Sequence, residues 1–241
     1  MNNNKLIKPV VWVAPPERVY NYGMLDANHQ IHPDVQVVSV EDFAQIRHQY
    51  GLGHIPPSEN LVLVRNPFEQ EKYCELSENL EFEFYDSKLH YIELVCKNIG
   101  AKKFNCTYQN VKTMKRERKG KTGTTIKYGT PKIGFVSKSE ERFKSELQIS
   151  SEWNPEQHFD KAKSLAEEHN LMSDPTVKAF LSDATNHKSY SKNVVVTQEV
   201  NKLFDIAFTL EGLEFFKFFD LKYRNYVEYL HEVSVIINVE F

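Results

Sequence analysis

Six basic side chains lie close together near the middle of the chain, and they are the clearest chemical signal in the sequence. One acidic residue, Glu117, lies among them. Cations gathered on one short segment repel each other, and a phosphate-bearing polyanion relieves that repulsion while it releases its own counterions. The sequence therefore predicts an anion-binding site formed by Lys112, Lys115, Arg116, Arg118, Lys119 and Lys121.

The charge of the whole chain conceals this local excess. The 241 residues include 30 Lys or Arg and 33 Asp or Glu, which gives a formal net charge of -3. Residues 101–150 contain 13 Lys or Arg and 4 Glu, a net charge of +9, so the other residues sum to -12. A solvated hairpin tip gives the same pattern, because lysines protect sheet edges from aggregation. Docking of the cations on the protein's own acidic parts, self-association and an acidic protein partner are further interpretations.

Lipid headgroups and nucleic acid are the two anionic partners that suit these cations. Proteins that bind single strands usually add exposed aromatic side chains for base stacking, whereas the cluster contains none and has Tyr108 and Tyr128 only at its margins. A membrane-perturbing protein needs strands of about 9–11 residues with alternating faces. Four segments have that pattern: 103–113, 143–153, 213–223 and 226–241. A sheet with one buried face in a soluble protein has it too.

The sequence contains none of the catalytic motifs G-x-S-x-G, H-E-x-x-H and G-x-G-x-x-G. His29 and His32 form an H-x-x-H pair in a Pro-bordered loop without a helix to fix them, so we expect no metal site. Cys96 lies on an apolar helical stripe, which favours an inert buried thiol, and His231 interrupts the apolar face of a strand, as a core histidine does. We expect no cofactor and favour a non-enzymatic protein. A hydrolase or transferase with a dispersed site is the alternative.

The elements next to the cluster follow from hydrophobic periodicity. Apolar residues alternate with Glu over residues 80–84, which favours a strand, with a helix that begins here as the alternative. Helical spacing then predicts a helix from about Ser87 to Gly100. The period changes to two after Gly100, and the glycines of residues 119–123 are typical of a tight connection to a second strand at 124–128. We therefore expect a basic β-hairpin over residues 102–135. A further amphipathic strand is predicted over residues 143–153.

The remaining elements are read in the same way. Pro155 and Asp174-Pro175 are typical helix starts, and apolar spacing predicts a third helix over residues 200–208. Residues 194–196 suit a strand, and the alternation over 219–241 predicts a hairpin with its turn near Arg224-Asn225. In the N-terminal region, short strands at 10–13 and 61–64 and a helix at 41–49 interrupt an otherwise irregular stretch.

These elements predict an α+β fold, mainly an antiparallel sheet with long amphipathic hairpins and three to five short helices. We expect a single unit over residues 1–241, with an irregular N-terminal part (1–85), a helix plus the basic hairpin (86–153), and helices plus a C-terminal hairpin (154–241). Three Cys without C-x-x-C spacing, and an N-terminal apolar run too short for a signal peptide, predict a cytoplasmic protein, peripheral to any membrane that it meets.

The sequence as a whole predicts a non-enzymatic effector or binding protein whose basic hairpin engages an anionic surface. Membrane perturbation of the pore-forming type, by amphipathic β-hairpins, is the most specific form of this hypothesis. Nucleic-acid binding by the same cations is the alternative, and it predicts affinity that falls steeply with salt.

Overall fold

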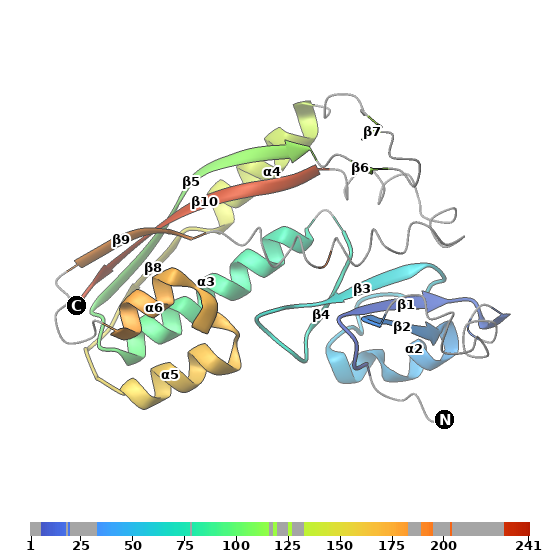
Figure 1. Ribbon diagram of the computed structural model, residues 1–241, viewed down its shortest axis with the longest axis horizontal. Helices are drawn as coiled ribbons and strands as arrows, with labels where there is room; N and C mark the ends of the chain where they lie inside the picture. Colours follow the sequence, from blue (N-terminus) through green and yellow to red (C-terminus); the bar gives the residue numbers. More distant parts are fainter. Residues whose placement is uncertain are drawn as a thin grey trace. The chain divides into compact units, whose positions relative to one another are not determined.

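A computed structural model gives the fold of the chain (Figure 1). It describes residues 6–17, 19, 33–77, 79–115, 118–119, 125–126, 133–182, 189–194, 203 and 229–241. The chain divides into two compact units, residues 1–80 with 199–227 and residues 81–198 with 228–241. The α+β class is confirmed, because helices accompany sheets whose strands pair mainly antiparallel. The expectation of a single unit over residues 1–241 stays a prediction, and each compact unit is described by itself.

The first unit contains a four-stranded sheet in the order β2-β1-β3-β4. Its strands are β1 (Val10–Ala14), β2 (Val35–Ser39), β3 (Leu61–Arg65) and β4 (Tyr73–Glu75). β1 and β3 confirm the strands predicted at 10–13 and 61–64. The interpretation of the rest as irregular is wrong, since β2 pairs parallel and β3 antiparallel with β1. β4 has only three residues, too few to display a period, and every residue of β1 is buried, so β1 shows no alternation.

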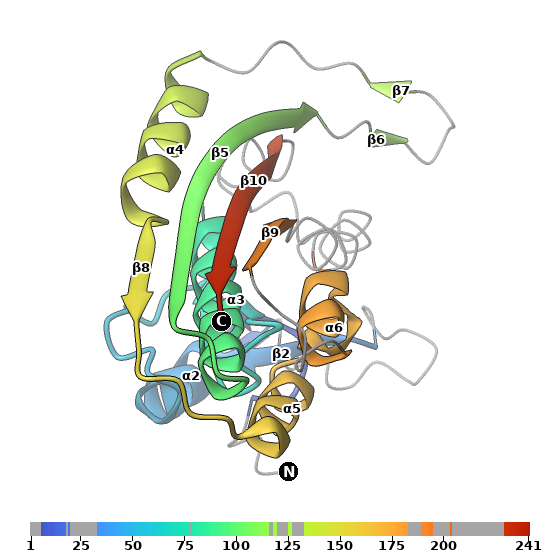
Figure 2. The same ribbon diagram turned by 90° about the vertical axis from the view of Figure 1, so that its left-hand side faces the viewer.

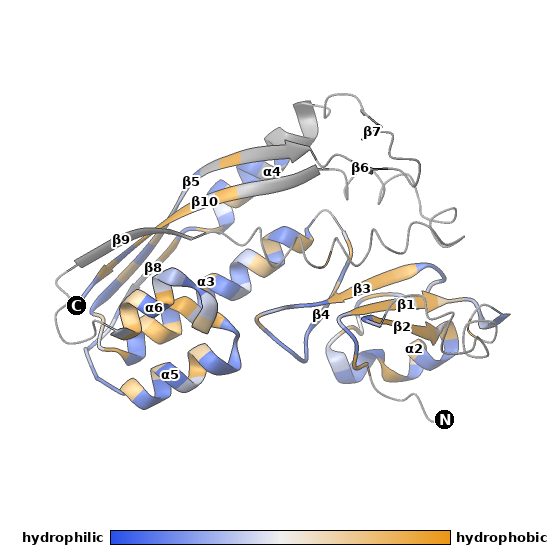
Figure 3. Ribbon diagram, in the orientation of Figure 1, coloured by the Kyte–Doolittle hydropathy of each residue, from blue (hydrophilic) through white to orange (hydrophobic). Residues whose placement is uncertain are grey.

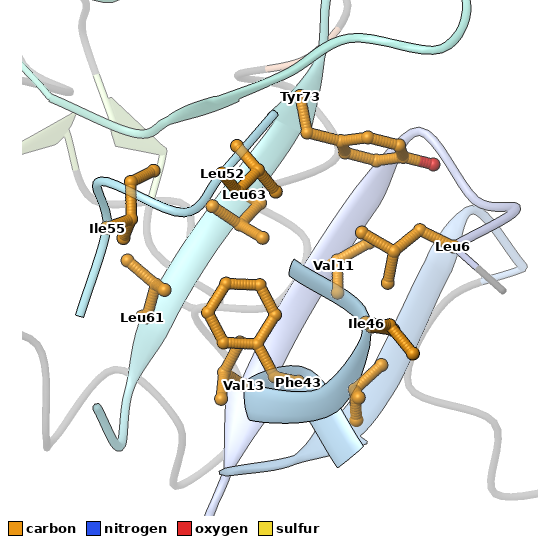
Figure 4. Packing of buried hydrophobic residues seen from close by; sticks show 11 residues of the cluster. Leu6, Val11, Val13, Phe43, Ile46, Leu52, Ile55, Leu61, Leu63 and Tyr73 are labelled. Atoms are coloured by element: carbon orange, nitrogen blue, oxygen red, sulfur yellow. The ribbon is translucent and has the colours of Figure 1, made fainter. Parts of the chain in front are cut away.

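Helix α2 (Val40–Ile46) covers this sheet and confirms the helix predicted at 41–49, with a 3₁₀ turn over Arg47–Tyr50 completing it. The Ser39 hydroxyl caps the helix by accepting a hydrogen bond from the Asp42 amide at 3.0 Å. Figure 4 shows Phe43 and Ile46 of the helix directed at Leu and Val side chains of β1 and β3. The cluster consists of Leu6, Val11, Val13, Val38, Phe43, Ile46, Leu52, Ile55, Leu61, Leu63 and Tyr73.

The second unit contains an antiparallel sheet in the order β8-β5-β10-β9. Its strands are β5 (Lys103–Lys115), β8 (Ile149–Glu152), β9 (Ser189–Val194) and β10 (Tyr229–Glu240). Figure 2 shows the four strands side by side, with helix α3 (Leu80–Asn98) behind them. The β5–β10 ladder runs from Lys103 opposite Glu240 to Lys115 opposite Tyr229, with a β-bulge where the register shifts between Ser234 and Val235.

Helix α3 confirms the helix predicted before Gly100, but it also includes residues 80–84, for which the predicted strand is wrong. Leu80 and Phe84 lie one helical turn apart and are both fully buried. Phe82 packs on another side, with its ring centroid 5.6 Å from that of Phe143. Because α3 has neighbours on several sides, its apolar residues do not form the single stripe by which a helix is recognised.

The amphipathic strand predicted over residues 143–153 is also wrong in its first half. Helix α4 (Ile133–Glu146) contains Phe143, and only Ile149–Glu152 form a strand, β8. Phe143 and Leu147 are four residues apart and both buried, and the exposed Arg142 pairs with Glu146 at 3.1 Å. Both spacings are those of a helix, and they coincide with a period of two over this short stretch.

The predicted basic hairpin has a different partner from the one expected. β5 pairs with β10 and, over residues 103–106, with β8. The segment after β5 forms its own short antiparallel ladder between β6 (Arg118–Lys119) and β7 (Thr125–Ile126). The predicted turn at residues 119–123 therefore connects two strands that pair with each other. The long hairpin predicted over 102–135 is wrong, because the partners of β5 are strands distant in sequence.

Two further helices, α5 (Phe159–Glu168) and α6 (Pro175–Ser182), follow β8. α5 begins later than Pro155, because Gln157 forms a β-bridge with Ile99 and the His158 amide donates to Asn98 at 2.7 Å. α6 begins at the predicted position, with the Asp174 carboxylate accepting from the Thr176 amide at 2.7 Å. β9 begins at Ser189, before the strand expected over residues 194–196, and ends at Val194.

Several predictions from the sequence lie outside the described residues. These are the helix over 200–208 apart from residue 203, the segment 213–223 and the turn near 224–225. Polar and apolar residues are mixed along the helices coloured by hydropathy in Figure 3, and none of the helices within the described ranges is long and apolar enough to span a bilayer.

Gly100, which ends α3, adopts φ 95°, and a Cβ there would lie 2.7 Å from Cγ of Gln157. We expect Gly100→Ala to lower the free energy of unfolding by about 1–3 kcal/mol, because an L side chain is strained at this φ. Urea denaturation followed by circular dichroism measures the loss. Gln157→Ala and the double variant separate backbone strain from crowding. Recovery of the full loss in the double variant would contradict a backbone origin.

Candidate anion-binding site

The backbone places four of the six predicted cations on strands. Lys112 and Lys115 belong to the last part of β5, and Arg118 and Lys119 form β6, which begins after a gap of two residues. Arg116 and Lys121 lie outside the described residues. The described positions therefore follow one another along the end of β5 and the short strand next to it.

Strand register shows which residues stand opposite these cations. Lys112 is opposite Glu232 of β10, a position at which unlike charges attract. The other three cations have uncharged residues opposite them. Lys115 is paired in register with Tyr229, Arg118 with Ile126, and Lys119 with Thr125.

Two lysines lie at the opposite end of β5, Lys103 within the strand and Lys102 directly before it, and both have partners within the unit. Lys103 forms an ion pair with Glu152 of β8 at 3.0 Å. This hydrogen bond and the charge of Glu152 raise the pKa of Lys103. The Lys102 ammonium donates to the main-chain oxygen of Phe241 at 3.1 Å. The positive excess is therefore not spread evenly along the strand.

Helix α4 contributes no net charge to the basic region. It contains Lys138, Arg142 and Lys144 together with Glu140, Glu141 and Glu146. The net charge of +9 over residues 101–150 therefore lies before residue 133. Lys102 and Lys103 account for two of these charges. The other charges lie in residues 112–132, which hold eight Lys or Arg and one Glu, a net charge of +7. About 40 Å of extended chain separates Lys103 from Lys115, at about 3.3 Å per residue.

Val111, one residue before the first cation of this group, is packed in the core. Val111 lies opposite Val233 of β10, and both are buried. The Tyr85 hydroxyl of α3 donates to the main-chain oxygen of Val233 at 3.0 Å, which fastens the helix to the sheet at this level. Burial raises the pKa of Tyr108 to about 12, and the negative charge of Glu140 on α4 adds to that rise. The cations therefore follow in sequence directly after a residue of the packed core.

No protein-family model matches the sequence, and neither a curated protein nor a solved structure is found to be similar to the chain.

The three cysteines of the chain do not form a catalytic site. Cys74, Cys96 and Cys106 are buried free thiols. Burial raises the pKa of Cys96, and it raises that of Cys106 to about 12, so both thiols are poor nucleophiles, as predicted for Cys96.

The interpretations of His29, His32 and His231 stay predictions. His29 and His32 lie outside the described residues, and His231 is known only by its register opposite Thr113. No group of three His, Cys, Asp or Glu that could hold a metal ion occurs among the residues that the structure describes.

A buried ion pair was not predicted from the sequence. The Lys88 ammonium of α3 lies 2.7 Å from the Asp174 carboxylate, and the two side chains are 3% and 8% exposed. Burial acts to raise the pKa of Asp174, but the charge and hydrogen bond of Lys88 and two backbone amides outweigh it, so the pKa is lowered. One signal was present: Lys88 falls between Tyr85 and Ile92 on an apolar side of the helix.

This pair joins the start of α6 to the middle of α3. A stacked contact lies beside it, with the Tyr91 and His169 rings 3.4 Å apart between centroids at an interplanar angle of 14°. Asp174 also accepts from the amides of Thr176 and Val177, so one carboxylate both caps α6 and neutralises Lys88. Its role is therefore structural, since it holds the helices behind the sheet.

We expect Asp174→Asn to lower the free energy of unfolding at pH 7 by about 3–5 kcal/mol, because it keeps the cap but leaves a buried charge on Lys88. Since the folded pKa of Asp174 is lowered, its contribution is complete above the unfolded pKa of about 3.9 and is lost as the pH falls through the folded pKa. Urea titrations between pH 2 and pH 7 measure both effects.

The exposed Lys103–Glu152 pair provides the control for that measurement. Its side chains are 46% and 72% exposed, so Glu152→Gln should cost less than about 1 kcal/mol. Equal losses from the two variants, or an unchanged acid dependence in Asp174→Asn, would show that burial does not set the strength of the Lys88–Asp174 pair.

Proposed function

We propose that this protein binds phosphate-bearing polyanions through residues 112–121, at the end of β5 and along β6. The observation that carries the proposal is the strand register. Three of the four cations with a described register, Lys115, Arg118 and Lys119, stand opposite uncharged residues. In the same register Lys112 is opposite the acidic Glu232, whereas these three have no acid directly opposite them.

The electrostatics of this arrangement favour a polymeric or surface ligand over a single small anion. Residues 112–121 hold six cations and one acid, a net charge of +5 on ten residues. Charges within about 8 Å of each other interact at physiological ionic strength. A ligand with many phosphates meets several cations at once and releases its counterions, which gives a favourable entropy that one phosphate cannot supply.

We propose binding at the surface of the partner, without insertion of strands into a membrane. The apolar side of β10 is packed inside the unit, with Val233, Val235 and Ile237 fully buried. Their removal from the core would cost about 1.5–3 kcal/mol for each side chain. The segment 143–153, which insertion would use as a strand, is half helix. The pore-forming version therefore receives less support than simple adsorption.

Replacement of Lys115, Arg116, Arg118 and Lys119 by Ala should weaken binding of fluorescent inorganic polyphosphate by about 30-fold or more, if each exposed charge contributes about 0.5–1 kcal/mol. Fluorescence anisotropy at 50 mM salt measures the affinity. Far-UV circular dichroism should stay unchanged, because the described core ends at Val111.

A matched variant removes the same formal charge elsewhere. Lys138, Lys144, Lys161 and Lys163 are exposed positions on α4 and α5. Their replacement by Ala should change the affinity for polyphosphate by less than about threefold. Similar weakening by both variants would reduce the effect to net charge, and absence of binding by the wild-type protein to polyphosphate, DNA and anionic vesicles would refute the proposal.

The register also predicts a variant that binds more tightly. Glu232→Gln removes the acid opposite Lys112 and makes that cation available to the ligand. We expect the affinity for polyphosphate to rise about twofold, which corresponds to about 0.5 kcal/mol. In the background of Lys112→Ala the same substitution should have no effect. A gain that persists in that background would mean that Glu232 acts on the ligand directly.

A further inference from the structure

We propose that two copies of this chain form a symmetric dimer by pairing the outer edges of their β8 strands. This inference goes beyond the proposed function and uses none of the basic residues on which that function depends. It follows from the groups that β8 exposes at the edge of its sheet and from the order of the residues around Ser151.

The outer edge of β8 presents main-chain groups that pair with no strand among the described residues. β8 is the first strand in the order β8-β5-β10-β9, and Figure 2 shows it at the margin of the sheet. The Trp153 amide donates to the main-chain oxygen of Lys102 at 2.9 Å, so it points toward the strand inside. Because the main-chain groups of a strand alternate between its two edges, those of Ser150 and Glu152 point outward. Both residues are exposed.

The side of β8 that faces helix α3 is only partly covered. Ser151 donates from its hydroxyl to the Glu93 carboxylate of α3, and the Lys97 ammonium of the same helix lies 6.0 Å from the ring centroid of Trp153. Ile149 and Trp153 are nevertheless half-buried on this side. A further strand at this edge would cover both side chains, and burial of their apolar surface would favour its addition.

The neighbouring elements limit the residues that can take part in such pairing. Helix α4 ends at Glu146, and Leu147 after it is buried in the core. Pro155 has no N–H to donate to a ladder. The pairing segment is therefore residues 148–154, and Ser151 is its midpoint. A two-fold axis at Ser151 pairs the segment antiparallel with the same segment of a second copy.

The segment is self-complementary in this register. Ser150 stands opposite Glu152 of the second copy, so that groups pointing outward from both chains exchange main-chain hydrogen bonds. Ile149 stands opposite Trp153 of the second copy, and each half-buried side chain covers the other. A register centred on Glu152 would instead place two carboxylates directly opposite each other, which is destabilising. The order of residues thus identifies a second copy of this chain as the partner and Ser151 as the axis.

The short segment predicts a weak dimer, because interfaces below about 1,200 Å² are usually transient. We expect the full-length protein to be monomeric at about 1 µM and largely dimeric above about 100 µM, in the range of weak complexes of this size. Sedimentation velocity at physiological salt, with a reductant, measures the distribution. A protein that stays monomeric over this whole range would overturn the inference.

Charge substitutions test which residues stand opposite each other. Ser150→Glu places an acid opposite Glu152 of the second copy, and the double variant Ser150→Lys with Glu152→Lys places lysines opposite each other. Each should weaken its own dimer by about fivefold or more, whereas a mixture of the two variants should dimerise because unlike charges then meet. Ser164→Glu, at an exposed position of α5, is the matched control and should change the dimer by less than about twofold. Failure of the mixture to dimerise better than the separate variants would contradict the register.

A cysteine at the axis tests the same register by a covalent readout. Residues directly opposite each other between hydrogen-bonded pairs have Cα atoms about 4.5 Å apart, within the range of a disulfide. Ser151→Cys should therefore form an intermolecular disulfide on mild oxidation, whereas Ser164→Cys should not, and the native cysteines are buried. Non-reducing electrophoresis measures the product. Equal cross-linking of the two variants, or stronger cross-linking of Ser150→Cys than of Ser151→Cys, would show that the axis does not pass through Ser151 and would overturn the inference.

Discussion

The antiparallel ladder between β5 and β10 is the constraint on which the second unit depends. It joins residues 103–115 to residues 229–240 through twelve register pairs. One side of it is the apolar wall against which α3 packs, with Phe104, Val235 and Val239 buried, and its outer edges accept β8 and β9. The bulge at Ser234 keeps the buried side continuous while it adds one residue to β5, and it increases the local twist. The positions of Lys112 and Lys115 follow from this register.

Electrostatic groups have two different roles in this unit. Lys88 is removed from water and is held by Asp174 at 2.7 Å, so it contributes to the order of the helices and to no ligand. The cations after Val111 follow a residue of the core in sequence, and most of those with a described register lack an acid opposite them. The chain thus combines one buried charge that is neutralised internally with a basic segment that we propose binds a partner. The near-neutral total conceals this division.

The sequence was sufficient for helices with clear end signals and for short, continuous apolar strands. Helix α3 from Ser87 to Gly100, helix α6 after Asp174 and the strands β1 and β3 were all predicted close to their observed positions. Errors arose where a residue packs on more than one side. Phe82 of α3 and Phe143 of α4 pack against each other. The sequence pattern assigns both to strands, because a helix with several neighbours has no single stripe of apolar residues.

The local hydrophobic pattern of the sequence could not identify which strands pair with each other. The composition of β5 was recognised, but nothing in residues 103–115 identifies β10 as the neighbour, since any amphipathic strand of suitable length satisfies the same period. The predicted cation cluster came from residue type alone, and its division into one cation with an acid opposite and three without needed the register. The Lys88–Asp174 pair likewise joins residues too far apart in sequence for a spacing rule.

The distance along the chain between β5 and β10 has a consequence for biosynthesis. More than a hundred residues separate Lys115 from Tyr229, which corresponds to about 10 s of translation. During that interval β8 can pair with residues 103–106 along one edge of β5. The other edge, which later pairs with β10, has unsatisfied amide and carbonyl groups. Lysines spaced along such a waiting strand repel a second nascent chain. The cations that we propose bind a polyanion in the folded protein would thus also keep unfinished chains on neighbouring ribosomes from pairing through the edges of their β5 strands.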